Sequence, residues 1–275
     1  MLESQTVSRL MVALLLTLHA TACALEPEPD NRNEQVYYRV GTADDGYRSN
    51  GERGNFIVTE IHWAGSVEKV DDGYVHHPDD VFIELQNRHN RPMYLTDWLL
   101  TIETGISMDT VQVIHDRHRA ARQTYLLPLR EINRPVEPNE FVVIAARRDG
   151  AFRQADYYID DLRIPDAPFS MTLQDLDERL LDAVGDHRKP LFAGSWDLIT
   201  ARSMERTQLL FNNRGDRDLA WHSYSLNEFS TDSDAELHVE LRSGVHEAFI
   251  ERTLATPGKP NSPDYSGNVS SGSFE

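Results

Sequence analysis

The feature that most constrains the fold is a series of short apolar or alternating runs that begins after Asn55. Turn-forming residues separate these runs, for example at Asp72-Gly73, Pro138-Asn139 and Asp149-Gly150. Runs of this length and pattern are typical of β-strands, and no segment carries the sustained apolar stripe of a helix. The sequence predicts nine strands, over residues 56–62, 81–86, 94–102, 111–114, 123–128, 141–146, 180–184, 203–207 and 236–241. We therefore expect an all-β fold, a two-sheet sandwich with elaborated loops, in which Trp63 and Trp98 belong to the core.

The N-terminus has the pattern of a targeting segment. The apolar run LMVALLLTL covers residues 10–18, and the small residues Ala20 and Ala22 precede Cys23, the single cysteine of the chain. A run of this length is much shorter than the roughly 20 residues that span a bilayer as a helix, so it indicates a signal peptide over residues 1–22. One cysteine cannot form an internal disulfide, and this favours a different chemical role for it.

The segment before Cys23 resembles the lipobox of bacterial lipoproteins. That resemblance implies cleavage before Cys23, a diacylglycerol on its thiol and acylation of the new amine. The alternative is an ordinary secretory signal in which the position of the cysteine is a coincidence. Residues 23–55 then form the lipidated cysteine and a flexible tether, because they are rich in Glu, Pro, Asp and Gly and show little periodicity. The polar residues 262–275 predict a disordered tail.

Several spaced motifs of the body resemble the lamin tail domain. They are Glu60 to Gly65 (EIHWAG), Asp80 to Asn87 (DVFIELQN), Leu95 to Leu100 (LTDWLL), the turn and strand EPNEFVVI at 137–144, the late strand SMER at 203–206, and the closing motif TPGKPN at 256–261. Asn139 stands at a turn position where the family usually has glycine. The resemblance implies an immunoglobulin-like sandwich over residues 56–261, with no catalytic residues and with a role in binding or scaffolding.

Two glutamates in apolar strands are candidates for chemistry. Glu60 and Glu84 lie in strands that the lamin tail family places near one another. Two facing carboxylates could share a proton or hold a metal ion. The alternative is that each carboxylate accepts hydrogen bonds from the backbone or from an arginine.

One ten-residue segment is the best local candidate for a metal site. It contains four carboxylates and two imidazoles, namely Asp71, Asp72, His76, His77, Asp79 and Asp80. Such side chains bind calcium or zinc, but adjacent histidines on an extended chain point in opposite directions. A solvated loop is the alternative interpretation of this segment.

Charge and motifs narrow the function. The chain has 27 basic and 45 acidic residues, a net charge of −18, which argues against nucleic acid as a partner. The resemblances to lipoproteins and to the lamin tail domain imply a non-catalytic protein with no cofactor beyond the lipid on Cys23, anchored at the outer membrane or the periplasmic face of a membrane, that binds an envelope protein or glycan. The alternative is a metal-dependent hydrolase or lectin-like module that uses the Asp71 to Asp80 segment. The sequence leaves the ligand and the oligomeric state open.

Overall fold

The fold was described from a computed structural model, which places residues 49–105, 122–207, 214–226 and 231–264. The predicted signal peptide, Cys23, most of the tether and the strand predicted over residues 111–114 lie outside these ranges. The chain divides into two units, residues 1–39 and 40–275, and the described residues all belong to the second. No helix among them is long and apolar enough to cross a membrane.

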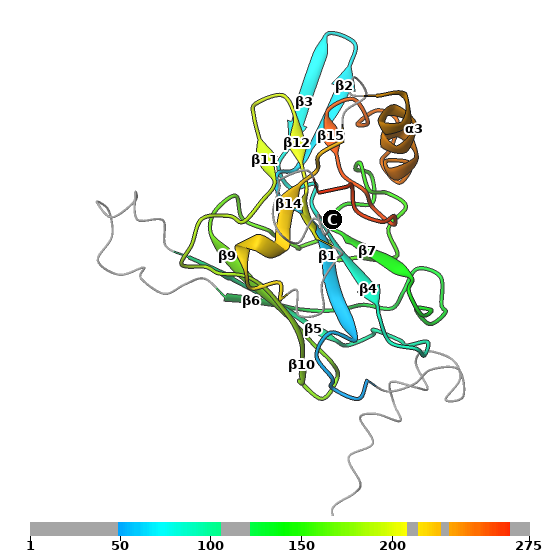
Figure 1. The fold of residues 1–275 in the computed structure, drawn as a ribbon, viewed down its shortest axis with the longest axis vertical. Helices are drawn as coiled ribbons and strands as arrows, with labels where there is room; N and C mark the ends of the chain where they lie inside the picture. Colours follow the sequence, from blue (N-terminus) through cyan, green and yellow to red (C-terminus); the bar gives the residue numbers. More distant parts are fainter. Residues whose placement is uncertain (1–48, 106–121, 208–213, 227–230, 265–275) are drawn as a thin grey trace, which may run out of the picture. The chain divides into compact units, whose positions relative to one another are not determined.

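Two antiparallel-rich sheets form the body (Figure 1). The larger sheet has the order β14-β13-β1-β4-β7-β8, and its strands are Trp221–Ser223, Met204–Arg206, Phe56–His62, Phe82–Asn87, Phe141–Ala145 and Tyr157–Tyr158. The smaller sheet has the order β10-β9-β5-β6, with strands Leu180–Gly185, Phe169–Gln174, Leu99–Thr104 and Arg122–Leu126. The predicted all-β two-sheet sandwich is therefore confirmed.

The main core lies between these two sheets. Val58, Ile83 and Ile144 of the larger sheet join Leu100 and Met171 of the smaller one in a single cluster of buried side chains. Both predicted core tryptophans belong to it, and the Trp98 ring meets Phe56 edge to face at 4.9 Å. Burial of this apolar surface is the main force that holds the sheets together.

A buried ion pair crosses the same core. Arg206 on β13 binds Asp182 on β10, and Arg206 Nη1 also donates to the carbonyl of Val58 at 3.0 Å. Asp182 Oδ2 accepts in turn from the Val58 backbone N at 2.9 Å. The pair thus satisfies the Val58 backbone beside the point where the β1–β4 register shifts between Val58 and Glu60.

That register shift decides which side chains of β1 face outward. Before the bulge, Phe56 and Val58 point into the main core, and after it Ile61 does so. Glu60 consequently lies on the opposite face of the sheet. A second apolar cluster covers another part of this outer face, with Phe82 and Val143 from the sheet and Phe152, Val245 and Phe249 from later segments.

Smaller elements extend from one end of the sandwich. The hairpin β2–β3, Ser66–Val70 and Gly73–His77, projects away from the main sheets (Figure 1). Strands β11 (Ser195–Trp196), β12 (Ala201–Arg202) and β15 (Thr253–Leu254) form a three-stranded sheet. The short 3-10 helix η2, Asp218–Ala220, precedes β14.

The prediction of a strand over residues 236–241 is wrong. This segment belongs to helix α3, Asp232–Leu241. The Thr231 hydroxyl accepts from the Asp234 backbone N at 3.1 Å and caps the helix, and Asp232 and Asp234 place negative charge in its first turn. Leu237, Val239 and Leu241 alternate as in a strand, yet the side chain of Val239 is 64% exposed. The helix therefore lacks the apolar stripe that would have revealed it.

The folded body extends slightly beyond the predicted boundaries at both ends. Gly54 N donates to Leu181 O at 3.0 Å, and Arg179 Nη2 donates to Ser49 O at 2.6 Å, so the last residues of the expected tether pack on the sandwich. Ser262, expected to open the disordered tail, is buried. Residues 265–275 lie outside the described part of the chain.

Turn residues adopt the conformations that their types allow. Gly65 has φ 73°, and a Cβ there would lie 2.4 Å from His77 O. Asn139 has φ 66°, so asparagine fills the left-handed position in which the lamin tail pattern has glycine. The Asn87 side chain caps its turn, with Nδ2 donating to the carbonyls of Arg91 and Val136 at 2.9 Å.

Candidate functional site

Three glutamates form a row across the outer face of the larger sheet. Glu60 on β1 is paired in register with Glu84 on β4 and with Glu205 on β13. All three side chains are completely buried. The prediction that Glu60 and Glu84 face one another is confirmed, and Glu205 is a third member that the sequence did not reveal. We call Glu60, Glu84 and Glu205 the glutamate row.

Residues 256–262, which we call the closing segment, supply most hydrogen bonds to the row. Thr256 N donates to Glu60 Oε1 at 2.9 Å, and Gly258 N donates to Glu84 Oε2 at 2.7 Å. Ser262 N donates to Glu205 Oε2 at 3.0 Å, and the Ser262 hydroxyl binds the same oxygen. Each glutamate therefore holds one backbone N–H of a segment that has no strand partner of its own there.

Geometry requires at least one of these carboxyl groups to be protonated if all close contacts are hydrogen bonds. The Thr256 hydroxyl lies 3.0 Å from Glu60 Oε2 and 3.2 Å from Glu205 Oε1. A hydroxyl has one proton, so it donates to one oxygen and accepts a proton from the other. Burial points the same way, because it raises the pKa of Glu60 to about 7.

The other two members of the row behave alike. Burial, and then the negative charge of Glu60, raises the pKa of Glu84 and that of Glu205 well above the usual range. The structure shows the alternative arrangement for Glu60 and Glu84, in which each carboxyl group accepts a hydrogen bond from the backbone, and the raised pKa values favour retention of a proton in the row. Its oxygens are directed at the closing segment and at Thr59, whose hydroxyl donates to Glu84 Oε1 at 2.6 Å. The glutamates thus act as hydrogen-bond acceptors that hold the closing segment against the sheet.

The structure separates the six metal candidates into different environments. Asp71 and Asp72 are exposed at the tip of the β2–β3 hairpin, whereas His76 and His77 lie at the opposite end of β3. The predicted solvated loop is thus mostly a hairpin. Among residues 49–105, 122–207, 214–226 and 231–264, no three His, Cys, Asp or Glu side chains come together in a group that could hold a metal ion.

The two adjacent histidines have different partners, as expected for an extended chain. His76 Nε2 lies 2.8 Å from Ala64 O, and its ring stacks on Trp196 with centroids 3.9 Å apart. His77 Nε2 contacts Glu68 Oε2 at 2.9 Å. The remaining candidate near the strand, Asp79, is exposed and lies 3.5 Å from Arg147 Nη1.

Asp80 is buried and acts within the body. Its Oδ2 accepts from Ala151 N at 2.7 Å and from the Ser66 hydroxyl. Burial raises the pKa of this carboxyl. A Cβ on Gly150 would lie 2.2 Å from Asp80 Oδ1, so the turn before Ala151 fits closely against the carboxylate. Asp80 thereby connects β2 to that turn.

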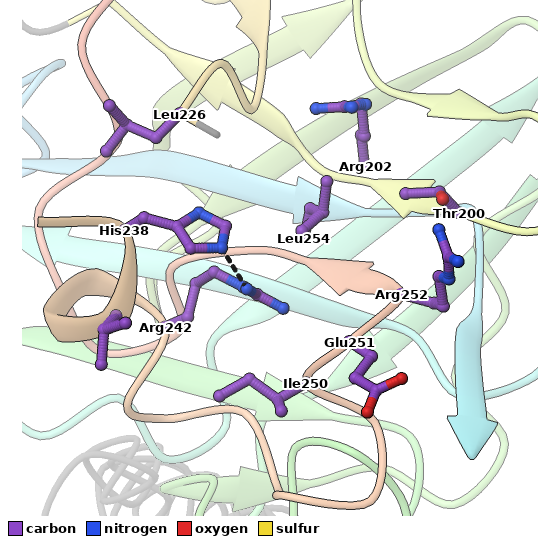
Figure 2. Close-up of a pocket in the computed structure, with 10 residues that line it drawn as sticks. Thr200, Arg202, Leu226, His238, Arg242, Ile250, Glu251, Arg252 and Leu254 are labelled. Carbon is purple, nitrogen blue, oxygen red and sulfur yellow. Dashed lines mark hydrogen bonds between the residues drawn. The ribbon is translucent and has the colours of Figure 1, made fainter. Parts of the chain in front are cut away.

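A cavity of about 580 Å³ opens beside α3, and it is not among the sites predicted from the sequence (Figure 2). Three arginines from separate elements line it: Arg202 on β12, Arg242 at the end of α3 and Arg252 immediately before β15. Leu226, Ile250 and Leu254 contribute apolar surface. We call this feature the arginine cavity.

A hydrogen-bonded chain fixes Arg242 at the cavity. Arg242 Nη1 lies 2.6 Å from His238 Nε2 (Figure 2), and Arg242 Nη2 donates to Thr253 O at 3.1 Å. Arginine only donates, so His238 Nε2 accepts and its Nδ1 carries the proton toward the Tyr224 hydroxyl, 2.7 Å away. Burial, with the positive charges of Arg242 and Arg202, lowers the pKa of His238 to about 4. The imidazole is therefore neutral.

The other two arginines are held loosely by comparison. Arg202 Nη1 donates to Tyr224 O at 3.1 Å. Arg252 lies over the Tyr74 ring at 5.1 Å, and its buried Nε has no acceptor among the described residues. The nearby carboxylate of Glu251 instead binds Lys69 and, at 2.8 Å, the Tyr74 hydroxyl. Within the part of the chain that the structure describes, neither Arg202 nor Arg252 forms an ion pair.

Comparison with known proteins does not assign the chain to a family. No family model matches the chain, and a search of curated proteins also finds no match.

Proposed function

We propose that the chain is a non-catalytic, lipid-anchored protein of the bacterial cell envelope. In this proposal Cys23 carries the lipid, the residues that follow it act as a tether, and the β-sandwich, similar to a lamin tail domain, binds or scaffolds a protein or glycan. The anchor is supported by the apolar run at residues 10–18 and by Ala20 and Ala22 before the single cysteine. An acidic body with net charge −18 has little attraction to anionic lipid, so a covalent anchor suits it.

The main support for a non-catalytic role is that the glutamate row is buried and bonded to the closing segment. A buried group of carboxyls with raised pKa values is the kind of site that supplies general acids and bases. Here Glu60, Glu84 and Glu205 are completely buried, and each accepts a backbone N–H from the closing segment. A substrate could reach these carboxyl groups only if the closing segment left the sheet. Binding at the surface of a stable sandwich fits this arrangement better than chemistry at the row.

The anchor is tested by fractionating cells that express the full-length protein or its Cys23→Ala variant. We expect the wild type in the membrane fraction, with a mass increase from lipid at its N-terminus, and the variant in the soluble fraction. If both proteins partition alike and neither carries lipid, the ordinary secretory signal is the better explanation of the N-terminus.

The binding role is tested by crosslinking in whole cells, followed by capture of the tagged full-length protein. We expect a defined envelope protein or glycan to be captured with the wild type and to be lost or reduced with Cys23→Ala, because the anchor concentrates the domain at the membrane. Recovery of only uncrosslinked monomer from intact envelopes would contradict the proposal.

A further inference from the structure

We infer that the arginine cavity binds an anionic group, a carboxylate or a phosphate, on a ligand that also has a short apolar portion. The inference rests on the proposed binding function and narrows the ligand by its chemistry. It assigns that recognition to Arg202, Arg242 and Arg252, which enter one cavity from three different elements (Figure 2).

The guanidinium groups provide the first argument. Arg202 and Arg252 form no ion pair among the described residues, and the buried Nε of Arg252 has no hydrogen-bond acceptor there. Buried arginine donors are normally satisfied by carboxylates, carbonyls or a bound anion. The planar donor fork of arginine matches a carboxylate or a phosphate, and both can be bound through two parallel hydrogen bonds. Because Arg252 Nε is itself buried, the donors left for a ligand are the Nη groups of Arg202 and Arg252, of which only Arg202 Nη1 donates to a described residue, Tyr224.

The charge around the cavity provides the second argument. The chain has net charge −18, yet three cations line this one space, and the single lining carboxylate, Glu251, is divided between Lys69, the Tyr74 hydroxyl and the charge of Arg252. His238 faces the same space as a neutral ring, because its Nε2 accepts from Arg242, so it leaves the charge of the cavity unchanged. Like charges held together raise the energy of the folded state, and an anion between them lowers it.

The other residues that line the cavity indicate what the ligand carries besides its anionic group. Leu226, Ile250 and Leu254 present apolar side chains to the cavity, and Thr200 adds a hydroxyl. A volume of about 580 Å³ lies within the roughly 300–1,000 Å³ that small-molecule sites occupy, so the cavity exceeds the size of a lone phosphate ion. An acidic group attached to a few carbon atoms fills such a space with complementary contacts.

Calorimetric titration of the purified full-length protein tests this inference. The probes are inorganic phosphate, hexyl phosphate and hexanoate, all at one ionic strength set with sodium chloride. We expect saturable binding of hexyl phosphate or hexanoate, and weaker binding of phosphate, which lacks the apolar portion. The tighter of the two six-carbon probes identifies the acidic group as phosphate or carboxylate. Failure of all three probes to bind at millimolar concentration would overturn the inference.

Charge-matched variants assign the binding to the cavity. Arg202→Gln and Arg252→Gln each remove one lining guanidinium, and we expect each to weaken the best probe by about tenfold or more. Arg217→Gln is the control, because Arg217 is exposed on the turn before η2 and its removal changes the net charge equally. Equal affinities in all three variants would place the binding elsewhere and refute the assignment.

A local signal makes the test independent of how the variants fold. His238 contacts Arg242 directly, so its imidazole resonances in the wild-type protein should shift saturably with the best probe. Unchanged His238 resonances at saturation would count against the cavity. The whole-cell capture experiment separates the two proposals: a captured partner that is unaffected by Arg252→Gln leaves the binding function standing and removes the cavity from it.

Discussion

The glutamate row and the arginine cavity hold charged groups of opposite sign, and the chain treats them differently. Every glutamate of the row accepts a backbone N–H from the closing segment, and the Thr256 hydroxyl contacts both Glu60 and Glu205. In the cavity, Arg242 is fixed by His238 and Thr253, while Arg202 and Arg252 have few protein partners. The difference separates a structural cluster, which is satisfied internally, from a cluster that retains donors for another molecule.

The largest effect should come from removing one member of the row. Glu205→Ala leaves the Ser262 backbone N without its acceptor and opens a space in a completely buried site. We expect the free energy of unfolding to fall by about 3 to 4 kcal/mol, measured by urea denaturation. The control is Glu247→Ala at an exposed position, with an expected change within about 0.5 kcal/mol. Equal effects of the two variants would show that the row does not fasten the closing segment.

The second effect concerns pH. Because the folded-state pKa of Glu60 is raised to about 7, the folded protein binds this proton more tightly than the unfolded chain does. The contribution of Glu60 to stability is therefore complete below about pH 4.5, the ordinary value, and is lost as the pH rises toward 7. Glu60→Gln does not titrate, so its stability relative to the wild type should increase by roughly 2–3 kcal/mol across this interval.

The comparison between wild type and Glu60→Gln cancels the contributions that other titrating groups make to the pH dependence of stability. His62 is buried, and its pKa is lowered to about 4, so it contributes stability that is lost as the pH falls below 6.5. That contribution has the opposite sign and is present in both proteins. Urea denaturation at several pH values between 4.5 and 8 gives the free energy of unfolding of both proteins as a function of pH. Parallel curves would mean that the pKa of Glu60 is not raised in the folded protein.

A smaller effect tests the backbone of the closing segment. Gly258 has φ 75°, and a Cβ there meets no atom within 4 Å, so substitution adds backbone strain without a clash. We expect Gly258→Ala to destabilise by about 1 kcal/mol and Gly258→Asn by less, because asparagine tolerates the left-handed conformation. The melting temperatures of the three proteins provide the measurement. An alanine variant as stable as the wild type would mean that the segment relaxes away from the row.

Replacement of one arginine of the cavity should affect stability much less than replacement of one glutamate of the row. Arg202→Gln relieves repulsion among three cations and loses one hydrogen bond to a carbonyl. We expect the stability without ligand to change by less than about 0.5 kcal/mol, measured by urea denaturation beside Glu205→Ala. A loss as large as that of Glu205→Ala would show that the cavity is a structural cluster too.

The smallest effect is expected from metal ions. The six candidates from Asp71 to Asp80 lie in different environments, and three ligands do not converge among the described residues. Thermal melts with added Ca²⁺, Zn²⁺ or Mn²⁺ should therefore match those without metal. A specific ion at 100 times its dissociation constant would add about 2.7 kcal/mol, and such a shift would restore the metal-dependent alternative.

Much of the sandwich could be predicted because its strands carry local signals. Strands β4 and β7 are short, largely apolar runs, in which Ile83, Leu85, Val142 and Ile144 fill the main core and Phe82 and Val143 belong to the second cluster. Strand β9 carries the same kind of signal, since Phe169, Met171 and Leu173 alternate with polar residues, although the predicted strands do not include it. The hairpin β2–β3 was harder to detect, because Val70, Tyr74 and Val75 are exposed and its apolar pattern does not follow burial.

The candidate sites depended on information that a single sequence does not contain. Glu60 and Glu84 could be paired only through the lamin tail resemblance, and the register that adds Glu205 joins strands far apart in the chain. The arginine cavity likewise gathers side chains from β12, α3 and the turn before β15. One signal was visible: His238 and Arg242 are four residues apart, a spacing that brings side chains together on a helix. It was missed because the segment was interpreted as a strand.

The position of the closing segment also has a consequence for how the chain acquires its structure during synthesis. Thr256, Gly258 and Ser262 follow all the strands and helices of the described body, yet they supply the donors for carboxylates on β1, β4 and β13. Until the closing segment has been synthesised, the three carboxyl groups lack these backbone donors, so burying them costs free energy. Completion of this face of the sheet thus waits for residues such as Thr256, which lies 196 positions after Glu60 in the chain.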